Sequence, residues 1–343
     1  MTSSSSHIHP PISIKQKEVS HIDETPRKRG RPKKEKTDSD NPLPLQRSVP
    51  ELEEWDPREL PNGFFLVLEG KRRTGKSTFA KWLLQWYQDK FSLVWVMSQT
   101  SVSGYWQPFV GNQFVFEGWR PGAVEKLIER NKAIVSQYGE DSPVSLAIGS
   151  ALIILDDCIT KEIFYSDIFT RLAVEGRHHL IAVLYITQDP KTVCPKVRDN
   201  ADVAVVFNQK TFRNKESIWH DFMNDVDKQT AFALLANYAI EHDALVCVQT
   251  NLNGKIERNF KKSTGDKTKL KDPNYMLGGP TQKEQIKKER AESKEYSKIK
   301  KLQEAADKRP MKEKGPHGSK AECFSKEAME KGGVSRFFST LDS

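Results

Sequence analysis

The sequence lacks any apolar segment long enough to cross a membrane. Its longest uninterrupted apolar run, Leu180 to Ile186, has the length of a β-strand rather than of a membrane-spanning helix. The amino-terminal stretch is rich in Ser and His and lacks the apolar core of a signal peptide. We therefore expect a soluble protein that works inside the cell without contacting a membrane.

Cysteine is also scarce. The chain has four cysteines, which are Cys158, Cys194, Cys247 and Cys323. No two of them form a C-x-x-C pair, and the closest histidine pairs, His7/His9 and His178/His179, have no cysteine at the spacing of a zinc site. The sequence thus predicts neither a disulfide framework nor a structural zinc site, which fits a reducing compartment.

The middle of the chain has no excess of positive charge. The net charge is +3 over residues 1–45, −3 over 46–260 and +9 over 261–320. Basic flanks around a slightly acidic centre favour binding to a polyanion, with nucleic acid as the first choice, and solubilising tails are the alternative. Residues 1–45 are also polar and poor in aromatics, which predicts a disordered basic arm.

Apolar runs of strand length alternate with helical stretches in the central part of the chain. We expect strands over 64–69, 93–98, 151–156, 180–187, 203–208 and 244–250. We expect helices over 76–90, 121–138, 160–176 and 216–236. The strands are almost continuously apolar, which indicates cover on both faces. This pattern predicts an α/β domain over 46–260, with a mainly parallel sheet and helices on both faces, followed by a Lys/Glu-rich tail over 261–343 that is helical or disordered.

A phosphate-binding motif lies between the first expected strand and the first expected helix. It matches G-x-x-x-x-G-K-[ST], the P-loop or Walker A pattern, and its positions are Gly70, Lys71, Arg72, Arg73, Thr74, Gly75, Lys76, Ser77 and Thr78. In such a loop the backbone N–H groups close around the β-phosphate at the positive end of the helix. Lys76 reaches the β- and γ-phosphates, and the Ser77 hydroxyl ligates Mg²⁺. The motif predicts a site for a nucleoside triphosphate with Mg²⁺.

Two carboxylates end the buried strand over 151–156. A P-loop NTPase needs an acid here to hold Mg²⁺ through water, and Asp156 takes this role in our prediction. Asp157 is then placed to orient and deprotonate the water that attacks the γ-phosphate. The alternative is structural, because Asp is common at strand ends as a turn former or helix cap.

The next strand also ends in polar residues, Thr187 and Gln188. In NTPases with an extra strand between the P-loop (Walker A) strand and the Walker B strand, a polar residue here contacts the γ-phosphate or the attacking water. The Gln188 amide both donates and accepts hydrogen bonds, which suits this task. A polar strand end without a role is the alternative.

Two arginines are candidates for a catalytic contact across a subunit boundary. Ring-shaped motors complete each site with an arginine from the neighbouring subunit, which stabilises charge on the transferring phosphoryl group. Arg177 and Arg198 are the candidates, and the sequence does not choose between them. Either one could instead form an ordinary surface ion pair.

Five motifs together resemble a known family. They are the P-loop, Ser98-Gln99-Thr100 after the second strand, Leu155-Asp156-Asp157, Gly176-Arg177-His178-His179 and Ile186-Thr187-Gln188. This arrangement resembles the genome-packaging ATPases of large double-stranded DNA viruses of the poxvirus type, with relatives in virophages and self-synthesising DNA transposons. These ATPases belong to the FtsK–HerA superfamily of P-loop NTPases.

The resemblance covers about residues 60–260. It implies a homo-oligomeric ring that hydrolyses ATP to ADP and phosphate and moves double-stranded DNA into a capsid, with capsid or portal proteins as partners. The location it implies is the host nucleus or a cytoplasmic viral factory, with possible association with the virion. Bacterial relatives carry Glu where this chain has Asp157, whose side chain is one methylene shorter.

A basic run near the amino terminus resembles an AT-hook. Its centre is Arg29, Gly30, Arg31 and Pro32. Glycine lets an extended backbone lie deep in a narrow minor groove, and the two arginines then point along it, where A·T tracts concentrate negative potential. The same run also satisfies a nuclear-localisation signal, and both functions are compatible.

A paired aromatic lies close to the carboxyl terminus. Val334, Phe337 and Phe338 have the spacing of the PIP box that binds the sliding clamp PCNA, although Lys331 replaces the usual leading Gln. Two phenylalanines in a tail favour a docking site of some kind.

The sequence as a whole favours an ATP-driven double-stranded DNA translocase that packages a viral or transposon genome. Two alternatives remain. One is another P-loop kinase or GTPase with basic tails, and the other is a DNA-tethered scaffold with weak ATPase activity.

Overall fold

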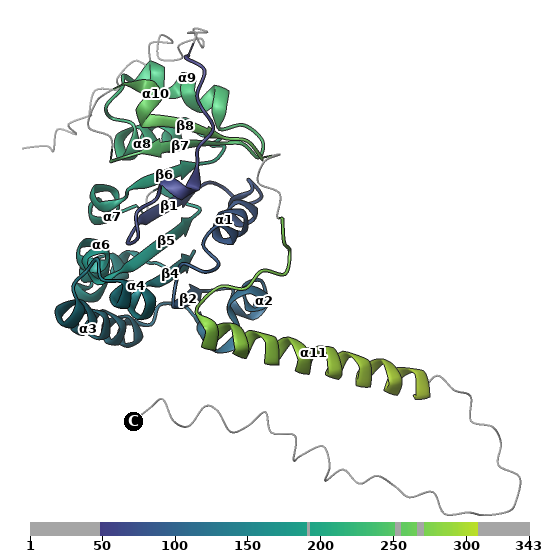
Figure 1. Ribbon diagram of the computed structural model, residues 1–343. Coiled ribbons are helices and arrows are strands. Elements are labelled where there is room, and N and C mark those ends of the chain that lie inside the picture. Colours follow the sequence, from purple (N-terminus) through teal and green to yellow (C-terminus); the bar gives the residue numbers. More distant parts are fainter. Residues whose placement is uncertain (1–48, 191–192, 251–254, 266–270, 308–343) are drawn as a thin grey trace, which may run out of the picture. The chain divides into compact units, whose positions relative to one another are not determined.

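The computed structural model describes residues 49–190, 193–250, 255–265 and 271–307 (Figure 1). The AT-hook-like run and the terminal valine and phenylalanines lie outside these residues, as does Cys323. The strands are β1 Phe65–Glu69, β2 Leu93–Ser98, β3 Val115–Glu117, β4 Ala151–Asp156, β5 Ile181–Thr187, β6 Val203–Val206, β7 Ala244–Val248 and β8 Phe260–Ser263.

These strands form one sheet in the order β3-β2-β4-β5-β1-β6-β7-β8. The pairs from β3 to β6 are parallel, whereas β7 and β8 are antiparallel to their neighbours. Strand β5 lies between β1 and β4, which confirms the predicted extra strand between the Walker A and Walker B strands. Because these strands are parallel, their carboxyl ends meet at one edge of the sheet.

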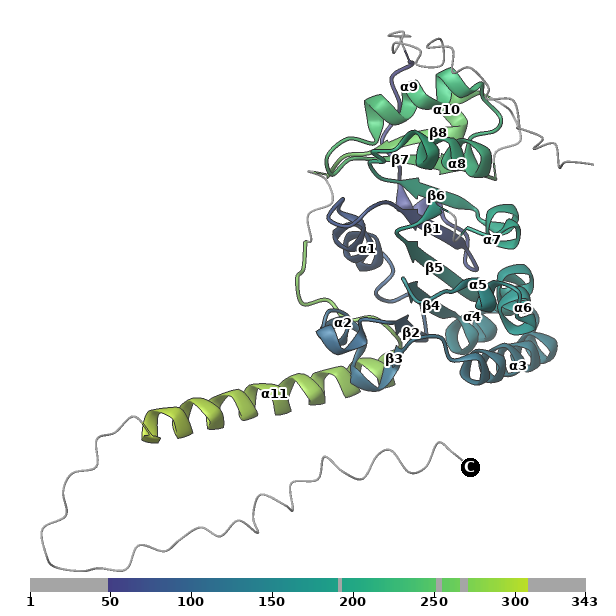
Figure 2. The same ribbon diagram turned by 180° about the vertical axis from the view of Figure 1, so that it is seen from behind.

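Helices cover both faces of the sheet. They are α1 Lys76–Gln85, α2 Gln107–Val110, α3 Pro121–Tyr138, α4 Pro143–Gly149, α5 Lys161–Phe164, α6 Asp167–Glu175, α7 Pro195–Asn200, α8 Phe212–Phe222, α9 Lys228–Tyr238, α10 Ile256–Asn259 and α11 Pro280–Asp307. Figures 1 and 2 show α1 and α2 on one face, and α3, α6 and α7 on the other. Among the described residues, no helix is both long and apolar enough to span a bilayer.

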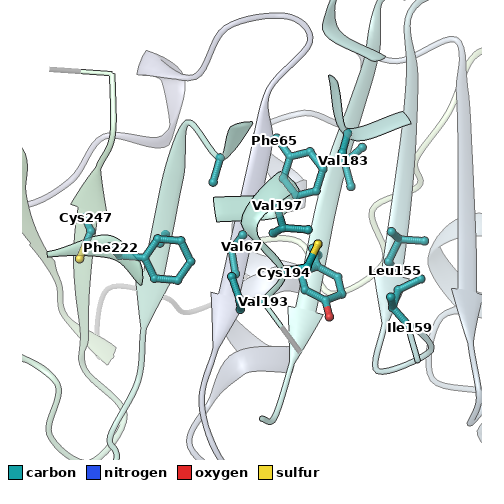
Figure 3. Close-up of a cluster of buried hydrophobic side chains, with 14 of the residues drawn as sticks. Phe65, Val67, Leu155, Ile159, Val183, Val193, Cys194, Val197, Phe222 and Cys247 are labelled. Atoms are coloured by element: carbon teal, nitrogen blue, oxygen red, sulfur yellow. The ribbon is translucent and has the colours of Figure 1, made fainter. Parts of the chain in front are cut away.

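Alternate side chains of each buried strand belong to different cores. Phe65 and Val67 of β1 pack into the core beneath α3, α6 and α7, part of which is drawn in Figure 3. Leu66 and Leu68 point the other way and pack against α1. All four are buried, as expected for a central parallel strand with helices on both sides.

Two helices expected from the sequence are each divided in the structure. The stretch 160–176 contains α5 and α6, because the Ser166 side chain accepts a hydrogen bond from the Phe169 N–H and starts a new helix. The stretch 216–236 covers the end of α8 and most of α9, because Asp227 caps α9 in the same way. The prediction of continuous helices was wrong at these caps.

The sheet and its core extend beyond residue 260. Strand β8 pairs with β7, and Tyr275 and Leu277 are buried in the core beside α1 and α2. On α11, the Gln282 amide bonds both backbone groups of Val94 at 2.9 and 3.0 Å. It thereby takes the place of a strand neighbour at the start of β2, where β3 pairs only from Val96 onward. The residues of α11 from 291 to 301 are exposed. The division of the chain into domains stays a prediction.

Candidate nucleotide-binding site

The loop between β1 and α1 has the backbone geometry that its glycines allow. Gly75 precedes α1 with a φ of +102°, a conformation that residues with a side chain rarely adopt. A Cβ on Gly70 would lie 2.7 Å from the Phe207 Cβ and 2.8 Å from the Thr74 hydroxyl. The loop therefore needs glycine at both ends, for conformational reasons at one and for space at the other.

Lys76 is held inside this loop. Its ammonium donates to the Lys71 carbonyl at 2.8 Å and to the Gly70 carbonyl. The side chain is only 8% exposed, and burial lowers its pKa, while the nearby carboxylates of Asp157, Asp156 and Glu69 act in the opposite direction. The loop carbonyls thus fix the Lys76 ammonium beside the carboxylates.

A cavity of about 460 Å³ opens in front of the loop. It is lined by ten residues, which are Arg72, Arg73, Gly75, Lys76, Ser77, Thr78, Asp156, Asp157, Ile186 and Gln188. They come from the P-loop, the end of β4 and the end of β5. The structure thereby brings the predicted residues of all three motifs together, and the volume is that of a small-molecule site.

Asp156 is half-buried at the end of β4. Its Oδ2 accepts a hydrogen bond of 2.8 Å from the indole N–H of Trp106. Burial raises the Asp156 pKa, and the Trp106 hydrogen bond acts against that rise. The following residue, Asp157, is exposed and has a φ of +52°, which turns its side chain out of the strand direction.

Gln188 joins Asp157 to the P-loop. Its Nε2 donates to Asp157 Oδ2 at 2.6 Å, and its Oε1 accepts from Arg72 Nε at 3.1 Å. Guanidinium groups only donate and carboxylates only accept, so the two partners fix which way the amide points. The sequence identified Arg72 only as a position of the P-loop and did not predict its contact with Gln188.

The donor set fits a magnesium nucleotide. Ser77 and Asp156 supply a hydroxyl and a carboxylate to the lining of the same cavity, and oxygen ligands of this kind suit Mg²⁺. Lys76 and the start of α1 supply positive charge for phosphates. ATP and Mg²⁺ therefore both fit the residues that line the cavity.

Glu69 is a second feature that the sequence reasoning missed. It is fully buried immediately before Gly70, and neither of its carboxylate oxygens has a hydrogen-bond partner among the described residues. Burial raises its pKa well above the ordinary value, nearby Asp221 and Asp189 raise it further, and Lys76 opposes them. An acid directly before a P-loop was visible in the sequence, but its burial was not.

The two candidate arginines do not line the cavity. Arg177 precedes β5 at the amino edge of the sheet, where its backbone packs against Gly63, and its side chain is exposed. Arg198 lies on α7 and pairs with Asp199 at 3.1 Å and Asp221 at 3.3 Å. Neither residue therefore completes the site of its own chain.

The fold and the site define a P-loop NTPase. Residues 55–244, more than half of the chain, match the family described as "Poxvirus A32 protein". This chain belongs to that family, and the resemblance inferred from its motifs is confirmed.

Several solved structures are similar to the chain at low sequence identity. The genome packaging NTPase B204 from Sulfolobus turreted icosahedral virus 2, in complex with AMPPCP, is 16% identical, with a TM-score of 0.41 over 60% of this chain and 99% of that chain. The pCW3 conjugation coupling protein TcpA is 12% identical, with a TM-score of 0.42 over 64% of this chain and 70% of that chain. EssC from Geobacillus thermodenitrificans is 12% identical, with a TM-score of 0.41 over 69% of this chain and 45% of that chain. No curated protein matches the chain.

Proposed function

We propose that this chain is an ATPase that hydrolyses ATP to ADP and phosphate and uses the energy to move double-stranded DNA into a viral capsid. One observation carries the proposal: the P-loop, the acids that end β4 and the amide that follows β5 share one cavity of about 460 Å³. Membership in the family described as "Poxvirus A32 protein" supports it independently.

Each cavity residue has a role in this proposal. The loop N–H groups and Lys76 bind the β- and γ-phosphates, while Ser77 and Asp156 hold Mg²⁺. Held by Ser77 and Asp156, Mg²⁺ would supply positive charge that offsets the charge of the phosphates. Asp157 accepts a proton from the attacking water, and Gln188 orients that water, because the two side chains already contact each other at 2.6 Å.

A cation from a second subunit is proposed to join Lys76 at the site. Arg177 suits this role better than Arg198, because its side chain is exposed, whereas the Arg198 guanidinium already binds two carboxylates. A ring in which the amino edge of one subunit faces the cavity of the next would supply Arg177 to each site.

The DNA and PCNA contacts are proposed from the flanks, and the capsid or portal partners from the family resemblance. Arg29, Gly30, Arg31 and Pro32 are proposed to contact double-stranded DNA, and capsid or portal proteins are proposed to receive the motor. Docking to PCNA through Val334, Phe337 and Phe338 remains a prediction from the sequence alone.

The proposal is tested by the ATPase rate with and without double-stranded DNA, measured with the native mass of the protein. We expect DNA to raise the rate and the active species to be an oligomer. A monomer whose ATPase rate ignores DNA would contradict translocation. Turnover of a small phosphoryl acceptor without DNA would favour a kinase instead.

A further inference from the structure

The dipeptide Tyr105–Trp106 contacts both residues that the proposed function assigns to Mg²⁺. It lies between β2 and α2. The Trp106 indole N–H donates to Asp156 Oδ2 at 2.8 Å, and the Tyr105 hydroxyl lies beside the Ser77 side chain. The two contacts come from adjacent residues of one loop, although Ser77 and Asp156 are far apart in the sequence.

The pair is firmly packed. Trp106 is only 2% exposed, and its ring meets the Tyr105 ring edge-on at 5.2 Å between centroids. The Lys81 ammonium lies 3.6 Å from the centre of the Tyr105 ring and 4.6 Å from that of Phe109. Because Lys81 belongs to α1, this cation–π contact ties the helix that follows the P-loop to the loop that carries the pair.

The two contacts orient the side chains of Asp156 and Ser77. An indole N–H only donates, so Trp106 occupies one oxygen of Asp156 and leaves the other, Oδ1, for the cation side. A serine oxygen that binds a cation uses a lone pair, and its proton then needs an acceptor, which the Tyr105 oxygen provides. Partners of this kind orient metal ligands and tune the affinity for the metal.

We propose that Tyr105 and Trp106 are positioning residues of the cation site, which hold Ser77 and Asp156 in the geometry that binds Mg²⁺. The proposal rests on the proposed function, because it takes the cavity to be a magnesium–nucleotide site. It adds an aromatic loop, outside the P-loop and the acidic strand, that sets how tightly the divalent cation is held.

The test substitutes Trp106→Phe, which removes the N–H and keeps an aromatic ring. The full chain is loaded with the non-hydrolysable analogue AMPPNP, and Mn²⁺ is titrated while free Mn²⁺ is followed by electron paramagnetic resonance. We expect the Mn²⁺ affinity to fall about 10-fold, the usual loss when a partner of a metal ligand is removed. In steady-state turnover, the half-saturating Mg²⁺ concentration rises in parallel, and the kcat recovers at high Mg²⁺.

Trp82→Phe is the matched control. Trp82 is buried in the same apolar core as Trp106, so both substitutions remove the same side-chain volume from that core. Tyr105→Phe keeps the ring above Lys81 and removes only the hydroxyl, so it tests the contact with Ser77. It also provides a second test if the Trp106→Phe protein fails to fold. We expect it to weaken Mn²⁺ binding, and the Trp82 control to leave it unchanged.

Unchanged Mn²⁺ affinity in a folded Trp106→Phe or Tyr105→Phe protein overturns the proposed role of that residue. Equal losses in Trp106→Phe and Trp82→Phe assign the effect to core packing and overturn the proposal as well. Failure of the wild-type protein to take up Mn²⁺ with AMPPNP is a different result, since it contradicts the magnesium–nucleotide site itself.

Discussion

The carboxyl and amino edges of the parallel strands are built for different purposes. At the carboxyl edge, the ends of β4 and β5 and the P-loop surround a cavity of about 460 Å³. At the amino edge, the cavity between the starts of β1 and β5 has about 10 Å³, room for about one water molecule. The helices close one edge by packing and leave the other open to a ligand.

The hydrogen-bond partners of polar side chains also differ between the two edges. At the amino edge they bond the backbone: Asp202 accepts from the Phe65 N–H at 2.7 Å, and Asn131 donates to the His179 carbonyl at 2.7 Å. At the carboxyl edge, Lys76 has only loop carbonyls as hydrogen-bond acceptors, and the Glu69 carboxylate has no hydrogen-bond partner among the described residues. Asp202 and Asn131 at the amino edge thus stabilise the fold through backbone groups, whereas Lys76 at the carboxyl edge lines the open cavity.

The largest effect is expected from Lys76→Ala. We expect the affinity for a fluorescent ATP analogue to fall about 100-fold or more, because a charged hydrogen-bond donor to phosphate is lost, and turnover to disappear. Lys126→Ala is the control, since Lys126 is an exposed residue of α3. Equal binding by the two variants would show that the carboxyl edge is not the nucleotide site.

At the amino edge, Arg177→Ala should reduce turnover by about 10³-fold, the usual value of an arginine that acts between subunits. Nucleotide affinity should stay the same, because Arg177 does not line the cavity of its own chain. Arg198→Ala is the comparison: it should lower the melting temperature through the lost ion pairs and leave turnover per folded protein unchanged. If Arg198→Ala lost turnover and Arg177→Ala did not, Arg198 would be the arginine that acts between subunits.

Gln188→Ala tests whether Gln188 positions the attacking water or binds the nucleotide. We expect turnover to fall about 10²-fold, as when a group that positions the attacking water is removed, while the affinity for nucleotide changes little. Gln113→Ala, at an exposed position, controls for loss of an amide. A large loss of nucleotide affinity in Gln188→Ala would instead make Gln188 a binding residue.

The smallest effect is expected from Glu69→Gln, and it depends on pH. The pKa of Glu69 in the folded chain lies well above its ordinary value of 4.5 because the carboxyl is buried. Folding then favours the protonated form, so the wild type loses stability as the pH rises above about 4.5 toward the raised pKa. Glutamine cannot ionise and avoids this loss.

Melting temperatures at pH 5 and pH 8 test this expectation for Glu69. The drop between the two pH values should be smaller in Glu69→Gln than in the wild type. A larger drop in the variant would indicate that the ionised carboxylate stabilises the fold through Lys76.

Sequence patterns predicted those parts of the site that are contiguous or lie at strand ends. The P-loop is one short segment, and Asp156 and Gln188 follow long apolar strands, so the shared edge of a parallel sheet places them together. Strands β3 and β8 were missed because they are three and four residues long and only partly buried, which leaves no apolar run to detect.

The contacts that the sequence did not predict join residues far apart in the chain. Trp106 binds Asp156 across 50 positions, and Arg72 binds Gln188 across 116. Gln282 reaches β2 from a stretch with a mostly polar composition, and a single buried amide leaves no periodic signal. Such contacts depend on the packing of the whole domain, which local patterns do not contain.

Mixing two inactive variants shows whether the amino edge of one subunit acts on the cavity of the next. Lys76→Ala retains Arg177 but is expected to bind nucleotide weakly, whereas Arg177→Ala is expected to bind nucleotide but lacks the arginine. We predict that their mixture, with double-stranded DNA present, regains ATP turnover well above the sum of the separate proteins. A mixture that forms oligomers and stays as inactive as its components would contradict this action between subunits.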